Sequence, residues 1–237
     1  MSDLFTAAEV LRRETSTGTF GAPVHWVYRP LVYAWRVHMA YQERFGIGPK
    51  RVVFVGMNPG PFGMVQTGIP FGEIAAVRDW LGLVDAVEIP PVQHPKRPIE
   101  GFACRRSEVS GRRLWGLFAD RFGDADSFFE EHYVLNYCPL SFLSESGANI
   151  TPDHLPAAER EPLEAACDRH LRAVIEALGP TWVIGIGGFA AERARRVVGG
   201  SEFPRIGQVL HPSPASPAAN RGWAEAATRQ LETLGIW

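Results

Sequence analysis

Four short, mostly apolar runs are spaced along the chain at intervals long enough to hold a helix. They are RVVFVG (51–56), HYVLNYCPL (132–140), TWVIGIG (181–187) and RIGQVLHP (205–212). Runs of this length, rich in β-branched residues and followed by loop residues, are typical of strands buried on both faces. Because helix-length segments separate them, we expect one four-stranded parallel sheet.

Segments with apolar residues at helical spacing lie between and after these strands. They cover 31–46, 73–83, 110–122, 159–179 and 189–198, and a last helix is expected after Pro217. Ser110 could cap the third of these helices, and Gly179 could end the fourth. The segment 84–109 is rich in Pro and basic residues and is expected to be irregular. The pattern predicts an α/β fold with helices on both faces of the sheet, in a single domain spanning 1–237.

Composition narrows the class of protein. With 237 residues, 46% of them hydrophobic, and seven Trp, the chain can bury a substantial core. No stretch approaches the roughly 18 apolar residues of a membrane span, and the N-terminus lacks a signal-peptide pattern, so we expect a soluble intracellular protein. The three cysteines are too few and too widely spaced for a disulfide framework, a zinc knuckle or an iron–sulfur cluster. We therefore expect neither a metal nor another cofactor.

Charge is unevenly distributed. The formal net charge is −2 and the sequence pI is about 6.4, which argues against a tight, nonspecific grip on nucleic acid. The segment 96–113 nevertheless carries six basic residues against Glu100 and Glu108. Its basic residues are Lys96, Arg97, Arg105, Arg106, Arg112 and Arg113. This segment is either a patch that faces phosphates or an ordinary solvated loop.

The loops that follow the strands are the first place to look for chemistry, because ligands of parallel sheets bind beyond the carboxyl ends of the strands. The loop 56–63, GMNPGPFG, contains three Gly and two Pro. Such a backbone is stiff and open to close approach by a ligand. Asn58 is its one side chain that has both donor and acceptor groups.

A second unusual loop begins with His211, at the end of the last predicted strand. Three prolines stiffen the following residues, and Ser216 could cap a helix whose first residue is Pro217. The free backbone amides at such a helix start suit a phosphate. Two stiff loops at the ends of strands of one sheet, each with a polar side chain, indicate a ligand site.

Other chemistries fit the sequence less well. Gly185, Gly187 and Ala190 match a dinucleotide-binding pattern, but they follow the third strand, and close packing of helix on strand explains the glycines better. The chain has no G-x-S-x-G elbow for a serine hydrolase and no H-E-x-x-H for a zinc hydrolase.

At these loops the chain resembles the single-strand-selective monofunctional uracil-DNA glycosylases, a branch of the uracil-DNA glycosylase superfamily. The shared segments are GMNPGPFGM-QTG-PFGE with VRDWLG (56–82), HPKRP with SEVSG-R-WG (94–116), N-CPL (136–140), G-G--AE-RARR (185–196) and HPSP--P-AN-GW (211–223). They occur in order and span roughly residues 25–235. The resemblance implies a three-layer α/β/α sandwich around a four-stranded parallel sheet.

The resemblance also implies an activity. Members of this family flip a uracil-type base out of single- or double-stranded DNA and hydrolyse its bond to the sugar, leaving an abasic site. It assigns the catalytic roles to Asn58, which would hold the attacking water, and to His211, which would donate a hydrogen bond to uracil O2. No lysine stands at these positions, which agrees with monofunctional chemistry without a Schiff base.

The resemblance further implies that Met57, Gly60, Phe71 and Asn136 bind the base. Phe71 would stack on it, and the Asn136 amide would donate to O4 and accept from N3–H, a pattern that cytosine reverses. An amide can flip, so neighbours must fix its orientation. Gly60 would face position 5, where a related branch has a bulky Tyr. Without a Cβ there would be room for a water or a polar substituent, so the implied substrates include uracil and 5-hydroxymethyluracil.

The loop after His211 would enter the gap left by the flipped base and contact DNA. The residues assigned to DNA binding are Pro212, Ser213, Pro214, Ala215, Ser216, Asn220 and Arg221. Ala215 departs from the family pattern, because vertebrate-type members have an intercalating Arg there, and this predicts weaker handling of duplex DNA.

Three rival functions remain at this point. One is a mismatch-specific uracil/thymine glycosylase, whose Asn-Pro-Gly loop is similar but lacks the FGM-QTG continuation found at 62–68. The others are a noncatalytic nucleic-acid-binding protein and a nucleotide-cofactor oxidoreductase. We expect a monomer that has DNA as its partner and lies with the DNA in the cell, in the cytoplasm or nucleoid if the source is bacterial.

Overall fold

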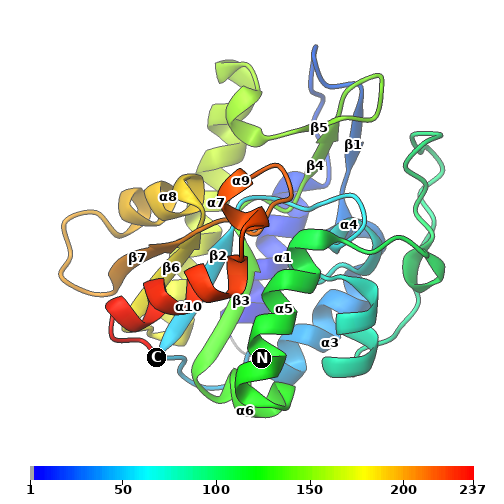
Figure 1. The fold of residues 1–237 in the computed structure, drawn as a ribbon. Coiled ribbons are helices and arrows are strands. Elements are labelled where there is room, and N and C mark those ends of the chain that lie inside the picture. The colour runs from blue at the N-terminus through cyan, green and yellow to red at the C-terminus, as the bar shows by residue number, and fades with distance from the viewer. Residues whose placement is uncertain (1–2) are drawn as a thin grey trace.

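A four-stranded parallel sheet forms the centre of the computed structural model, which describes residues 3–237 (Figure 1). The strands lie in the order β3-β2-β6-β7. They are β2 (Val52–Gly56), β3 (His132–Asn136), β6 (Trp182–Ile186) and β7 (Arg205–Val209). All four predicted strands are confirmed, and each ends before the loop residues that follow it in the apolar run.

Burial and pairing explain where these strands end. Every residue of β2 is buried, as expected for a central strand rich in Val and Phe, and every residue of β3, at the edge of the sheet, is buried as well. Gly56 pairs with Asn136 in the parallel register, and Ile186 pairs with Val209. The carboxyl ends of the four strands therefore lie along the same side of the sheet, where the loops after them meet.

Helices cover both faces of the sheet, which confirms the α/β/α sandwich (Figure 1). On one face, Phe118 of α5 packs against Phe54 of β2, with ring centroids 5.2 Å apart. On the other face, α8 packs so closely on β6 that a Cβ at Gly185 would overlap the backbone of Ala191. The helices are α1 (Asp3–Thr15), α2 (Pro30–Tyr33), α3 (Trp35–Phe45), α4 (Met64–Thr67), α5 (Val109–Phe122), α6 (Ala125–Glu131), α7 (Ala157–Leu178), α8 (Gly188–Val198), α9 (Pro217–Asn220) and α10 (Trp223–Thr233). Three short turns complete them: a π-helical turn at Ala76–Trp80 and 3-10 turns at Gly101–Ala103 and Pro152–His154.

A second, small sheet lies beside the sandwich and was not predicted. Its antiparallel strands are β1 (Trp26–Tyr28), β4 (Ser141–Leu143) and β5 (Asn149–Ile150), in the order β1-β4-β5. After Asn136 the chain leaves the main sheet through the loop residues of the run 132–140 and joins this second sheet at Ser141. Strands of two or three residues carry too little alternation to be recognised locally.

Two predicted helix boundaries were also wrong. The helix expected at 31–46 is broken at Ala34, which has φ −114° and ψ 27°. Close approach explains the break, because the backbone of Gly68 lies directly against Ala34. The helix expected to start from a Ser110 cap begins at Val109 with Glu108 as its N-cap, and the Glu108 side chain makes no capping hydrogen bond.

The C-terminal helical region follows the predicted start. The Ser216 hydroxyl accepts a hydrogen bond from the Ala219 N–H, and Pro217 occupies the first turn, so the predicted cap is confirmed. The single helix expected there is divided into α9 and α10 at Gly222, which adopts φ 130°. A residue with a side chain rarely adopts this conformation.

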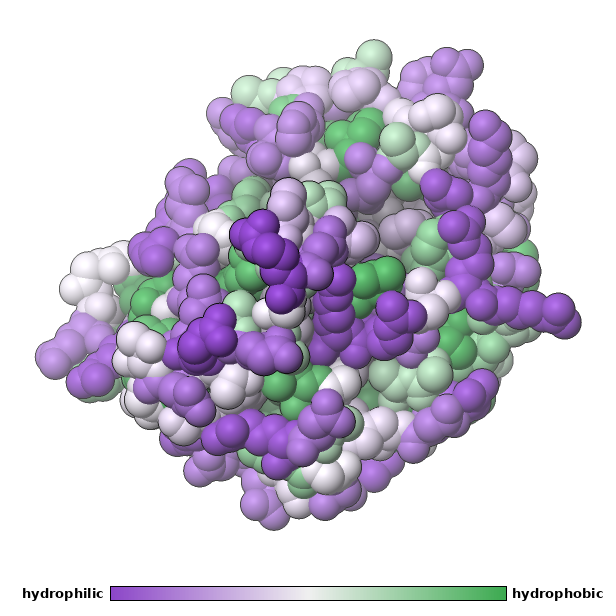
Figure 2. Space-filling view, viewed as in Figure 1, coloured by the Kyte–Doolittle hydropathy of each residue, from purple (hydrophilic) through white to green (hydrophobic). Residues whose placement is uncertain are grey.

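Hydrophilic side chains predominate on the face viewed in Figure 2, with smaller apolar patches among them. Within the described part of the chain, no helix combines the length and the apolar character needed to cross a membrane.

Candidate active site

A pocket of about 630 Å³ opens at the edge where the parallel strands end. The loops after β2, β3 and β7 form its walls together with the segment that leads into α5. Its lining includes every residue predicted to act on the base: Met57, Asn58, Gly60, Phe71, Asn136 and His211. Ser213 and Pro214 also line it, whereas Pro212 is buried and Ala215, Asn220 and Arg221 are exposed on the adjoining loop, with Ser216 half-buried.

Gly56, the last residue of β2, allows two of these side chains to meet. A Cβ on Gly56 would overlap the Asn136 amide oxygen and the ring of Phe71. Both groups therefore occupy the space that a side chain at this strand end would fill. The glycine of the loop motif is needed for this close approach, in addition to any need for a tight turn.

Phe71 has a backbone conformation that an ordinary core phenylalanine does not need. Its φ is 53°, and it is the one non-glycine residue with positive φ between residues 3 and 237. Such a conformation costs about 1–3 kcal/mol and tends to occur at functional sites. The Phe71 carbonyl accepts hydrogen bonds from the Trp115 indole at 3.1 Å and the Glu73 N–H at 2.7 Å, which hold it in place. Its ring lies on the pocket wall, 6.3 Å from the ring of His211.

A hydrogen bond to Met64 fixes the orientation of the Asn136 amide. Its Nδ2 donates to the sulfur of Met64 at 3.3 Å. A thioether can accept but cannot donate, so it favours the amide nitrogen over the oxygen at this position. Asn136 Oδ1 is buried and has no partner among the described residues. The side chain thus keeps an unused acceptor at the pocket.

His211 is neutral and its tautomer is defined by the loop. Burial lowers the pKa of His211 to about 4. The Ser213 N–H donates to His211 Nδ1 at 3.0 Å, so Nδ1 is an acceptor and the single ring proton is on Nε2. The Nε2–H group is therefore available as a donor on a ring that lines the pocket.

Asn58 is anchored in a similar way. Its Nδ2 donates to the Leu140 carbonyl at 3.3 Å, in the loop after β3. This contact leaves the Asn58 side-chain oxygen as an acceptor for a water in the pocket.

The arginines of the basic segment 96–113 make different kinds of contact. The Arg113 guanidinium donates to the Pro212 carbonyl and to Asn220 Oδ1, both at 2.9 Å. Asn220 in turn donates to the Pro214 carbonyl at 2.8 Å. Arg113 and Asn220 therefore brace the loop that carries His211. Arg106 lies on the pocket rim with its guanidinium 4.0 Å from the ring centroid of Phe62.

The model of the uracil DNA glycosylase superfamily matches residues 45–232 of this chain. A single-strand selective monofunctional uracil-DNA glycosylase from Rattus norvegicus is 49% identical over 227 residues, covering 95% of this chain and 82% of the relative. Its counterpart from Bos taurus is 50% identical over 219 residues, covering 92% and 80%. The chain belongs to the single-strand selective monofunctional uracil-DNA glycosylases, a family of the uracil DNA glycosylase superfamily. The crystal structure of wild-type SMUG2 from Pedobacter heparinus has the same fold, with a TM-score of 0.71 at 18% identity, covering 99% of this chain and 97% of that one.

Sequence reasoning missed three residues that shape the site of this family member. Met64 orients Asn136, Arg113 braces the His211 loop, and Glu108 lines the pocket beside Gly60. Met64, Glu108 and Arg113 all stand within the segments that carry the family resemblance. Their roles depend on contacts between distant parts of the chain, which no local pattern reveals.

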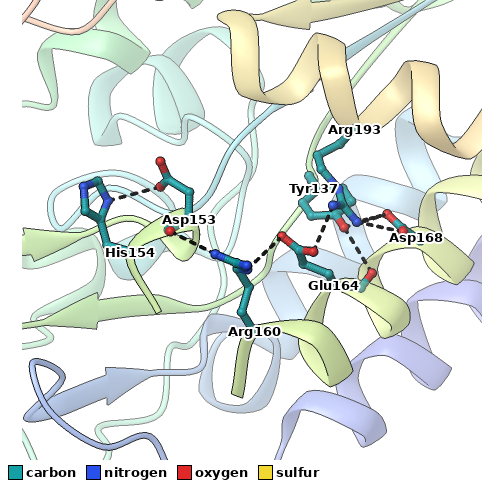
Figure 3. Close-up of polar contacts among 7 residues, drawn as sticks. All are labelled: Tyr137, Asp153, His154, Arg160, Glu164, Asp168 and Arg193. Carbon is teal, nitrogen blue, oxygen red and sulfur yellow. Dashed lines mark hydrogen bonds and ion pairs between the residues drawn. The ribbon is translucent and has the colours of Figure 1, made fainter. Parts of the chain in front are cut away.

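A buried ionic network supports the strand end that carries Asn136. The hydroxyl of Tyr137, the next residue, lies 2.6 Å from the Asp168 carboxylate (Figure 3). Arg193 of α8 donates to both oxygens of Asp168 at 2.7 Å and to Glu164 at 2.9 Å. The Arg193 side chain is only 8% exposed, so these contacts tie α7 and α8 to the loop after β3.

We expect Arg193→Met to destabilise the protein by about 3 kcal/mol, because it leaves the carboxylates of Asp168 and Glu164 without their buried partner. For a protein of this size, that corresponds to a fall in Tm of roughly 6–12 °C. Thermal unfolding followed by circular dichroism measures it. The control is Arg196→Met, an exposed arginine of the same helix. Equal Tm values for the two variants would contradict the role of the network.

Proposed function

We propose that this protein flips uracil and 5-substituted uracils out of single- and double-stranded DNA and hydrolyses their bonds to the sugar. Removal of uracil from DNA in base excision repair is supported by its membership of the family. The observation that carries the proposal is that three neutral polar side chains line one pocket. Each is held in place by a hydrogen bond to the surrounding protein and keeps another polar atom free. These groups belong to Asn58, Asn136 and His211.

Breaking the glycosidic bond places negative charge on the departing base and positive charge on the sugar. The Nε2–H of His211 donates to uracil O2, where the negative charge develops. A donor held by the protein in a dry pocket stabilises this charge without the cost of reorganising solvent. Asn58 holds a water against C1′. A neutral amide is a poor base, but an oxocarbenium-like carbon needs only a weak nucleophile.

Base identity is read on the other side of the pocket. The Asn136 oxygen accepts from uracil N3–H, and the second Nδ2 hydrogen donates to O4. Cytosine presents the reversed pattern on this edge, so it leaves buried donors and acceptors unpaired. Phe71 provides the stacking surface. Because Met64 holds the amide in one orientation, discrimination does not depend on a freely rotating side chain.

Contact with DNA belongs to the loop after His211. Residues 212–216, with Asn220 and Arg221, enter or flank the gap left by the flipped base. The backbone N–H groups of Ser213, Ala215 and Ser216 already donate hydrogen bonds within the loop, so the phosphate contacts expected from free amides there are not assigned to them. Asn220 acts through the loop conformation that it shares with Arg113. The protein acts in the cell as a monomer bound to DNA.

The decisive experiment incubates the protein with a uracil-containing oligonucleotide and cleaves abasic sites with alkali. Asn58→Ala is expected to lower the excision rate by about 100-fold, because the water loses its fixed acceptor. The exposed His154→Ala serves as the control and is expected to keep full activity. Binding without strand cleavage by the wild type would favour the noncatalytic rival. Faster removal of thymine opposite guanine than of uracil would favour the mismatch-specific branch.

Met64→Leu tests how Asn136 is oriented. Leucine has nearly the same volume, so stability should change by less than about 1.5 kcal/mol. The sulfur acceptor is lost, however, and the amide becomes free to flip. We expect kcat/KM for uracil excision to fall about tenfold. Met39→Leu, a buried methionine of α3, controls for loss of a thioether. An unchanged kcat/KM in the folded Met64→Leu protein would rule out this role for the sulfur.

Ala215→Arg tests the departure in the exposed loop. A long basic side chain at this position could fill the gap in a duplex, so we expect the ratio of double-strand to single-strand excision of uracil to rise several-fold. Ala158→Arg adds the same charge at another exposed position and should leave the ratio unchanged. Identical ratios for wild type and Ala215→Arg would refute the link between Ala215 and duplex handling.

A further inference from the structure

The wall of the pocket beside Gly60 is formed by a carboxyl group. A Cβ on Gly60 would overlap Glu108 Oε1, and a Cβ on Gly63 would overlap Glu108 Oε2. Gly60 does not have a positive φ, so its backbone does not require glycine. The Glu108 carboxyl group occupies the notch that the two glycines leave, so a side chain at either position would displace it.

This carboxyl group has unused hydrogen-bonding capacity. Glu108 Oε2 is buried and has no partner among residues 3–237, and the side chain does not cap α5. Burial, with a smaller effect from the nearby Glu73 carboxylate, raises the pKa of Glu108 to about 7. Near neutral pH a large share of the group is therefore protonated, with one donor and one acceptor. A buried polar group without a partner is costly unless a ligand satisfies it.

We propose that Glu108 is a specificity-determining residue whose carboxyl group hydrogen-bonds a polar substituent on C5 of the bound base. The inference rests on the proposed function, in which Gly60 faces position 5. Glu108 and Gly60 line the same pocket, and Oε1 is the carboxyl oxygen that lies against Gly60, so a substituent that projects from C5 toward Gly60 meets Glu108 Oε1.

This arrangement separates three bases by chemistry as well as by size. The hydroxyl of 5-hydroxymethyluracil can both donate to and accept from the carboxyl group. Plain uracil leaves space in which a water can serve the same partner. The methyl group of thymine fills that space and offers no hydrogen bond to Glu108 Oε1, which opposes its binding.

The test compares kcat/KM for single-stranded oligonucleotides carrying uracil or 5-hydroxymethyluracil. Glu108→Met keeps the length of the side chain and removes its polar atoms. We expect the ratio of 5-hydroxymethyluracil to uracil excision to fall about tenfold or more in this variant. Glu108→Gln keeps a donor and an acceptor and should stay within about threefold of the wild-type ratio. The control, Glu100→Ala, removes an exposed carboxylate of the same segment and should leave the ratio unchanged.

Each outcome decides a separate point. An equal loss on both substrates in Glu108→Met, or an equal fall in the ratio for Glu108→Gln and Glu108→Met, overturns the inference. If Glu108→Met does not fold, Glu108→Ala provides the same comparison without the added volume. Wild-type protein that excises uracil but not 5-hydroxymethyluracil also overturns it, while uracil excision stands. Wild-type protein that excises neither base refutes the proposed function itself.

Discussion

Gly56 links the pairing of β2 with β3 to the shape of the pocket. Parallel pairing sets the end of β2 beside Asn136, and the missing Cβ lets the Phe71 ring and the Asn136 amide share the space next to it. Any larger residue would push the Phe71 ring or the Asn136 amide away from this position. Phe71 also needs its positive φ to reach this place, and the Trp115 indole stabilises that conformation from behind. The shape of the pocket therefore depends on the register in which β2 and β3 pair.

Burial of the pocket favours the neutral forms of the titratable groups that line it. Burial lowers the pKa of His211 to about 4 and raises that of Glu108 to about 7, so both shifts favour the uncharged form. An ionised carboxylate beside the base would oppose the negative charge that develops on the leaving group. A neutral imidazole can still donate to that charge. The guanidinium of Arg106 lies at the rim, where solvent reduces its cost.

Much of this architecture could be predicted from the sequence, for identifiable reasons. The four main strands are continuous apolar runs, and Asn58 and His211 follow strand ends, so local pattern and topology are enough to place them. Strands β4 and β5 escaped prediction because they have two or three residues each and are fixed by pairing with each other and with distant β1. Met64 and Glu108 escaped for a related reason: a methionine and a glutamate have no local signature, and their roles arise only where the chain brings them against Asn136 and Gly60.

The start of α5 contacts both the pocket wall beside Gly60 and the loop that follows His211. Glu108 stands at its N-cap, with its carboxyl group against Gly60, while Arg113, in the second turn, holds the carbonyl of Pro212. Pro212 directly follows His211, whose tautomer depends on the same loop. A shift of this helix end would therefore move the pocket wall beside Gly60 and the loop that carries His211 together. One short segment supports both features, so a stretch that looked like a basic surface patch contains residues facing inward.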